Sequence, residues 1–109
     1  MKFVYKDNRI KTLIEEDAVF LKQYGASAMK KRDRRLNEIA SYENVAELFR
    51  LGRNGPGRWH VLDGRNGGKD EGKISGDLSG NYRLLLSPVN TPYGVAVEVE
   101  IAEIKDTHK

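Results

Sequence analysis

Hydrophobic and polar positions follow different periods in the two halves of the chain. Over residues 1–6, the aromatic residues Phe3 and Tyr5 lie two positions apart between Lys2 and Lys6, a pattern typical of a strand. Hydrophobic residues then recur at helical spacing, at Ile10, Leu13, Ile14, Ala18, Leu21 and Tyr24. We therefore expect one helix up to Tyr24, capped by Asp7 or Asn8 and ended by Gly25 in a left-handed turn.

A second helical period follows at about residues 27–40. Its expected inward side chains are Met29, Leu36, Ile39 and Ala40, and the basic cluster KKRDRR (30–35) is expected to face mostly outward. A single glycine-containing turn between the two helices predicts an αα-hairpin. Asn44 with Glu47 resembles a capping box, which predicts a short third helix over 45–51.

The remainder of the chain alternates short β-type runs with turn residues. The runs are RWHVL, GKISGDL, YRLLLSP and VAVEVEIAEI, separated by segments rich in Gly, Asn, Asp and Pro. In the last run Val95, Val97, Val99 and Ile101 alternate with Ala96, Glu98 and Glu100, which predicts one buried and one wet face. The alternation slips between Ile101 and Ile104, as at a bulge or a strand end.

Together these patterns predict a single α+β domain over residues 1–109. We expect an N-terminal strand and a helical hairpin packed on one face of a small, mostly antiparallel sheet. The length of 109 residues and a 39% hydrophobic content are sufficient for one modest core.

The composition excludes several classes of chemistry and location. The chain has no cysteine, so disulfides, thiolate metal sites and thiol catalysis are excluded. No apolar run approaches the roughly 18 residues of a membrane span. The N-terminus lacks the hydrophobic core of a signal peptide, so we expect a cytoplasmic protein with no membrane partner.

Charge is distributed more unevenly than the net value of +3 suggests. Five of the six residues in KKRDRR are basic, and the glycine-rich stretch 50–73 adds further cations. The candidate RNA-binding residues are Lys30, Lys31, Arg34, Arg35, Arg65, Lys69 and Lys73. A segregated basic surface favours a polyanionic partner, and the alternative is an ordinary solvated helix face.

The candidate catalytic groups are few. No glycine-rich loop lies between a strand and a helix, and two histidines with scattered carboxylates lack the spacing of a zinc site. What remains is His60, Arg83, Asp106 and His108, a set that suits phosphoryl chemistry without a metal. The alternatives are a half-buried sheet histidine, an arginine paired with a neighbouring carboxylate, and a solvated C-terminal tail.

The order of these segments resembles the RelE/HigB family of bacterial toxins, in particular its HigB-like "killer protein" branch. The resemblance is carried by His60 with Leu62 and Gly64, by DLSGNYRL at residues 77–84, and by the ending EIKDTHK at residues 103–109. The helical half, including KQYGASAMKKRDRRLNEI, is similar in length and character. The resemblance therefore spans nearly the whole chain and implies a RelE-like fold.

The resemblance also implies a function. Such a toxin enters the ribosomal A site and cleaves messenger RNA by attack of a ribose 2′-hydroxyl, without a metal or other cofactor. His60 and His108 match the catalytic histidines, Asp106 the C-terminal acid, and Arg83 the phosphate-stabilising arginine. The implied partners are the ribosome, messenger RNA and an antitoxin, a small helix-turn-helix protein that would also connect the toxin to operator DNA.

Two residues depart from the family pattern. Asp63 stands where the family commonly has a lysine, and Arg65, Lys69 or Lys73 would then supply the missing charge. Thr107 stands where an aromatic residue is common and cannot stack on a base. These departures favour the alternative function, a non-catalytic or degenerate toxin of the RelE/ParE superfamily that acts by binding RNA or a protein target.

Overall fold

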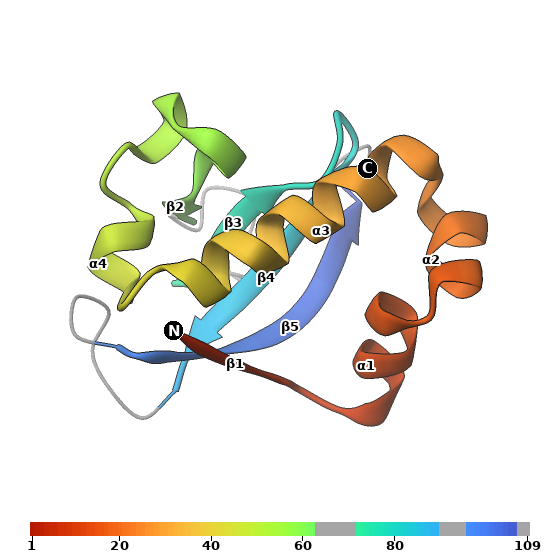
Figure 1. Cartoon of the computed structure of the whole chain (residues 1–109), viewed down its shortest axis with the longest axis horizontal. Coiled ribbons are helices and arrows are strands. Elements are labelled where there is room, and N and C mark those ends of the chain that lie inside the picture. The colour runs from red at the N-terminus through yellow and green to blue at the C-terminus, as the bar shows by residue number, and fades with distance from the viewer. Residues whose placement is uncertain (63–71, 90–95, 107–109) are drawn as a thin grey trace.

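The computed structural model describes residues 1–62, 72–89 and 96–106, and it has the expected α+β architecture (Figure 1). The helices are α1 (Asn8–Glu15), α2 (Asp17–Tyr24), α3 (Ala26–Ser41) and α4 (Val45–Leu48), followed by the 3-10 turns η1 (Gly52–Asn54) and η2 (Pro56–Arg58). The strands are β1 (Lys2–Tyr5), β2 (His60–Val61), β3 (Ile74–Asp77), β4 (Tyr82–Pro88) and β5 (Glu98–Asp106). Within these described ranges, no helix is both long and apolar enough to cross a membrane.

In the described part of the chain, the strands form one five-stranded sheet in the order β1-β5-β4-β3-β2. β1 runs parallel to β5, and every other pairing is antiparallel, which confirms the expected mostly antiparallel sheet. The chain therefore leaves β1, builds its helices, and returns to place its last strand beside its first. The N-terminal ammonium group donates to the carbonyl oxygens of Ile39, Ala40 and Tyr42, which ties β1 to the end of α3.

The hydrophobic core lies between the helices and one face of the sheet. Ile74, Leu84 and Ile101 belong to the same buried cluster as Phe20 of α2 and Ile39 of α3. Figure 1 shows α3 running across this face of the sheet. The strand residues that alternate with Ile74 and Leu84 consequently point to the opposite face.

The first helical segment is two helices rather than one. Glu16 is extended, with φ −83° and ψ 106°, and separates α1 from α2. This break resets the helical phase, so Phe20 is buried whereas the expected inward Leu21 is 45% exposed.

Asp7 caps α1 as expected, through a 2.9 Å hydrogen bond from the backbone N–H of Ile10. Gly25, with φ 92° and ψ 167°, joins α2 to α3 in an extended mirror-image conformation instead of the expected left-handed turn.

The expected orientation of α3 is confirmed for its apolar residues only in part. Ala28 and Ile39 are buried, Met29 and Leu36 pack against the core, and Ala40 is exposed. The outward orientation expected for the basic cluster is wrong for two members, because Arg32 and Arg35 are buried.

Both buried arginines of α3 lie beside carboxylates, but among the described residues only Arg32 bonds to another helix. Arg32 donates to the carbonyl oxygen of Ile14 at 2.9 Å and pairs with Asp17 and Asp33. Burial lowers the pKa of Arg32, but these two carboxylates outweigh it and raise the pKa overall. Arg35 Nε lies 3.3 Å from Glu38 Oε1, which also accepts a 2.9 Å hydrogen bond from the Trp59 indole.

The last strand confirms the slip in its sequence pattern. Leu85 pairs with Glu103 and Leu86 pairs with Ile101, so Ala102 is an extra residue on β5. This bulge allows both Ile101 and Ala102 to be buried. The expected alternation is wrong before the strand begins at Glu98, where Ala96 is buried and Val97 is 61% exposed. Val95 lies outside the described residues.

Candidate functional site

The polar candidates of the sheet converge on the face opposite the core. Residues that pair across antiparallel strands share a face. His60 pairs with Ser75 and Ser75 with Leu85, while Asp77 pairs with Arg83. We call this side of the sheet the distal face; its described members include His60, Ser75, Asp77, Arg83, Leu85, Glu103 and Lys105, of which Ser75 and Leu85 are buried.

Arg83 is held by the hairpin that connects β3 to β4. Its Nε lies 3.1 Å from Asp77 Oδ1, and its Nη1 donates to the carbonyl oxygens of Ser79 at 2.5 Å and Tyr82 at 3.0 Å. The turn is stabilised in addition by the Ser79 hydroxyl, which accepts from the backbone N–H groups of Asn81 and Tyr82. The expected pairing of Arg83 with a neighbouring carboxylate is therefore present, and the partner is Asp77.

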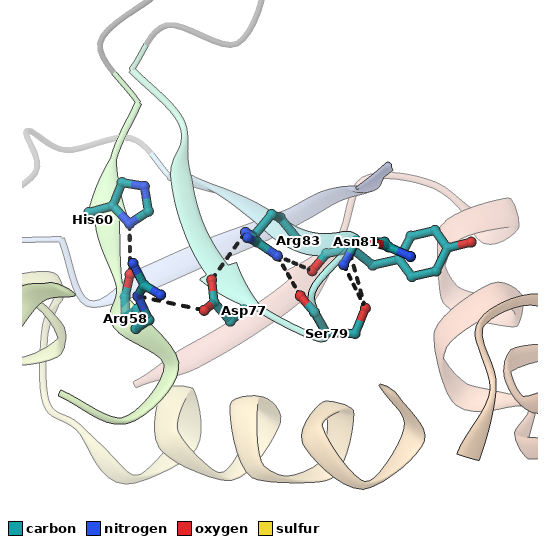
Figure 2. A network of polar contacts seen from close by, with 7 residues as sticks. Arg58, His60, Asp77, Ser79, Asn81 and Arg83 are labelled. Carbon is teal, nitrogen blue, oxygen red and sulfur yellow. Dashed lines mark hydrogen bonds and ion pairs between the residues drawn. The ribbon is translucent and has the colours of Figure 1, made fainter. Parts of the chain in front are cut away.

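Asp77 connects Arg83 to a second arginine. Its other carboxylate oxygen lies 3.8 Å from Arg58 Nε, so one acid stands between two guanidinium groups (Figure 2). The Arg58 side chain is 59% exposed, compared with 25% for Arg83. The cluster of two cations and one anion has one net positive charge.

His60 lies beside this cluster, and its ring is oriented by the backbone. Its Nδ1 is 2.7 Å from the carbonyl oxygen of Arg58. A carbonyl oxygen only accepts, so this interaction places the proton of the neutral ring on Nδ1 and leaves the Nε2 lone pair available. Figure 2 shows the ring extending away from the Arg58 carbonyl. A neutral imidazole in this tautomer is suited to accept a proton from a substrate.

Asp106 does not share the face of the other two candidates. It pairs with Tyr82 at the end of β5, whereas the preceding residue, Lys105, pairs with Arg83. Tyr82 packs against the core and its ring contacts Tyr24 of α2 at 4.8 Å between centroids. The exposed Asp106 carboxylate therefore projects from the helix-covered face, one residue beyond the distal-face cluster. A catalytic role for Asp106 stays a prediction.

The candidate RNA-binding residues divide by exposure. Lys30 and Arg34 are exposed on α3, Lys31 is partly buried, and Arg35 is buried against Glu38. Lys73 lies next to β3 and pairs with Glu103 of the distal face at 3.3 Å. His108, Asp63, Arg65, Lys69 and Thr107 lie outside the described residues. Among the residues that the structure does describe, no three His, Asp or Glu side chains gather where they could hold a metal ion.

Sequence reasoning overlooked Arg58 and Asp77 as members of this cluster. Arg58 is one cation among several in a glycine-rich stretch, although the surrounding GPGR is a turn signal. Asp77 opens the DLSGNYRL stretch, and its hairpin spacing from Arg83 was the signal that could have paired them.

Comparison with known proteins adds no assignment to this geometry. No protein-family model matches the chain, and no curated protein matches it at a significant level. The interpretation of the site therefore depends on its residues and their positions.

Proposed function

We propose that this protein is the toxin of a type II toxin–antitoxin module and acts as a ribosome-dependent, metal-independent endoribonuclease on messenger RNA. The observation that carries the proposal is the joint position of His60 and Arg83 on the distal face, with the Nε2 of His60 available as a proton acceptor. The proposal includes a cytoplasmic location and neutralisation by an antitoxin.

The reaction assigns a distinct step to each group. His60 Nε2 removes the proton of a ribose 2′-hydroxyl, and the 2′-oxygen bonds to the adjacent phosphorus. Arg83 stabilises the added negative charge on the phosphate oxygens. The bond from phosphorus to the 5′-oxygen breaks, and His108 in its protonated form donates a proton to that oxygen. The products are a 2′,3′-cyclic phosphate and a 5′-hydroxyl.

The basic surface of α3 provides the second part of the proposal. Lys30, Lys31 and Arg34 contact phosphates of ribosomal RNA by charge, without reading bases. Arg35 does not take part in this binding because its side chain is buried. The enzyme would therefore use α3 for docking and the distal face for chemistry.

A non-catalytic toxin is the second candidate, and one observation favours it. Arg83 is already engaged by Asp77 and by two hairpin carbonyl groups, as a purely structural arginine would be. Such a protein would arrest growth by binding RNA or a protein target, and its effect would not depend on His60.

Replacement of His60 by alanine separates the two candidates. Loss of a proton-transfer group lowers the cleavage rate by about a hundred- to ten-thousand-fold. Primer extension on message in a translating extract without antitoxin measures this rate. Val61→Thr, a substitution on the same strand, is the matched control and should cut at the wild-type rate. Growth arrest that persists unchanged in His60→Ala, without cleavage by the wild type, would overturn the nuclease.

A further inference from the structure

We propose that Arg58 is a second phosphate-binding residue of this site, forming with Arg83 a two-arginine clamp around one phosphate of the RNA. This inference deepens the proposed function and rests on it for the identity of the ligand. Three features support it: the unused donors of Arg83, the backbone conformation of Arg58, and the shared partner Asp77.

Arg83 alone cannot surround a phosphate. An arginine has five N–H donors on three nitrogens. The Nε of Arg83 faces Asp77, and its Nη1 donates to Ser79 and Tyr82. Its Nη2 has no partner among the described residues, so this nitrogen is the one that can reach a ligand. A phosphate bound at this nitrogen therefore needs a second cation on the side that faces away from Arg83.

The backbone holds Arg58 at the site at a conformational cost. Its φ is 50°, in the left-handed region, and it is the only non-glycine residue of the described ranges with a positive φ. Such conformations persist when the surrounding structure enforces them, and they are frequent at functional sites. Here the flanking residues enforce it on both sides.

The enforcing interactions come from the loop before β2. A Cβ at Gly57 would lie 2.6 Å from Arg35 Nη1 and 2.7 Å from Trp59 Nε1, so this backbone packs directly on α3. Trp59 is buried, and its indole donates to Glu38. Between these anchors Arg58 turns outward, and its exposed guanidinium extends to the distal face (Figure 2).

The two arginines and His60 are spaced for one phosphate. Sheet geometry separates the Cα atoms of His60 and Arg83 by roughly 12 Å, two strands across and two residues along. Side chains from both positions can meet over one phosphate at this separation. Asp77 holds the guanidinium groups of Arg58 and Arg83 on either side of its carboxylate, at 3.8 Å and 3.1 Å. The net positive charge of this trio favours an anion, and it lies beside the proton acceptor of the ring.

The probe for this clamp is an RNA trinucleotide with 2′-O-methyl groups, which cannot be cleaved. Binding is measured by NMR at several salt concentrations. We expect Arg58→Gln to weaken binding by roughly ten-fold. The slope of log K against log salt should fall by less than about 0.7, the value for losing one whole phosphate on a single strand, because Arg83 still faces the same phosphate. Lys22→Gln removes one exposed positive charge from α2 and should leave both quantities unchanged.

Arg58→Gly distinguishes the side chain from the strained backbone. Glycine adopts a positive φ without cost, so this variant should keep the loop and the melting temperature but bind the trinucleotide as weakly as Arg58→Gln does. Wild-type binding by a folded Arg58→Gly would overturn the proposal. If the trinucleotide binds through Arg58 but no message is ever cut, the clamp stands and the nuclease fails. If message is cut equally well by wild type and Arg58→Gly, the nuclease stands and the clamp fails.

Discussion

Arg32 on α3 and Arg83 on the distal face are both arginines paired with aspartate, but they offer different chemistry. All three nitrogens of Arg32 are engaged, by Asp33, by the Ile14 carbonyl and by Asp17, and its guanidinium lies 5.0 Å from the Phe20 ring centroid. Arg83, by contrast, has an Nη2 without a partner among the described residues. A cluster of basic residues thus indicates a binding surface only where donors remain unused and exposed.

The largest expected difference between Arg83 and Arg32 is in their effect on catalysis. Arg83→Ala should lower message cleavage by about a hundred- to a thousand-fold, as loss of a transition-state donor does. The same variant loses an ion pair and two hairpin hydrogen bonds, so its free energy of unfolding should fall by about 1 kcal/mol. Primer extension and thermal melts measure the two quantities.

Arg83→Lys keeps the charge but loses the planar fork, and it should recover only part of the rate. A fully folded Arg83→Ala that cuts as fast as wild type would assign Arg83 to the structural class of Arg32.

Arg32→Ala should show the opposite result, a large loss of stability with no loss of cleavage. It leaves the buried Ile14 carbonyl oxygen unsatisfied and separates α3 from the junction of α1 and α2, at a cost of about 2–3 kcal/mol. Cleavage per folded molecule should stay at the wild-type value. Urea denaturation measures the stability, and Arg34→Ala, an exposed neighbour on the same helix, is the control. Equal stabilities for the two variants would contradict the structural role of Arg32.

The sequence predicted the parts of this molecule that depend on local periodicity. The strand expected over 1–6 lies at Lys2–Tyr5, and the helix expected at about 27–40 lies at Ala26–Ser41. The slip expected between Ile101 and Ile104, as at a bulge or a strand end, is a bulge in β5. The break at Glu16 did not, because both flanking segments have helical spacing and the extended residue is neither Gly nor Pro. Local propensity gave no signal there, and the burial of Phe20 instead of Leu21 shows the new helical phase of α2.

The candidate site was predictable in its residue types but not in its geometry. His60 and Arg83 share a face because of a strand register that depends on the whole sheet. The burial of Arg35 depends on a loop some twenty residues away, where Gly57 and Trp59 close over it. The alternation that places Asp106 with Tyr82 follows from the bulge at Ala102, whose exact position the sequence did not determine.

A smaller effect tests the exposed part of the basic cluster. Replacing Lys30 and Arg34 by glutamate should weaken ribosome binding and flatten its salt dependence, by about 0.9 in slope for each duplex phosphate that is no longer bound. The fold should be retained, since both side chains are exposed. Binding is measured by sedimentation with ribosomes across a salt series. An unchanged slope of the salt dependence would mean that this surface is only a solvated helix face. The cations that bind phosphate would then lie on the distal face.

The smallest expected effect is the dependence of the free energy of unfolding on pH through Tyr5. Burial, together with the charge and hydrogen bond of Glu15, raises the pKa of Tyr5 to about 12. The folded protein thus holds this proton more tightly than the unfolded chain, whose tyrosine ionises near pH 10. Tyr5 therefore contributes stability that is present below pH 10 and is lost as the pH rises to about 12. Because Tyr5 is only partly buried and its hydrogen bond to Glu15 is exposed to solvent, the loss should be at most about 1 kcal/mol. Urea denaturation between pH 9 and pH 11.5 should show a shallower decline for Tyr5→Phe than for wild type. Parallel curves would mean that the Tyr5–Glu15 hydrogen bond does not discriminate between the folded and unfolded states.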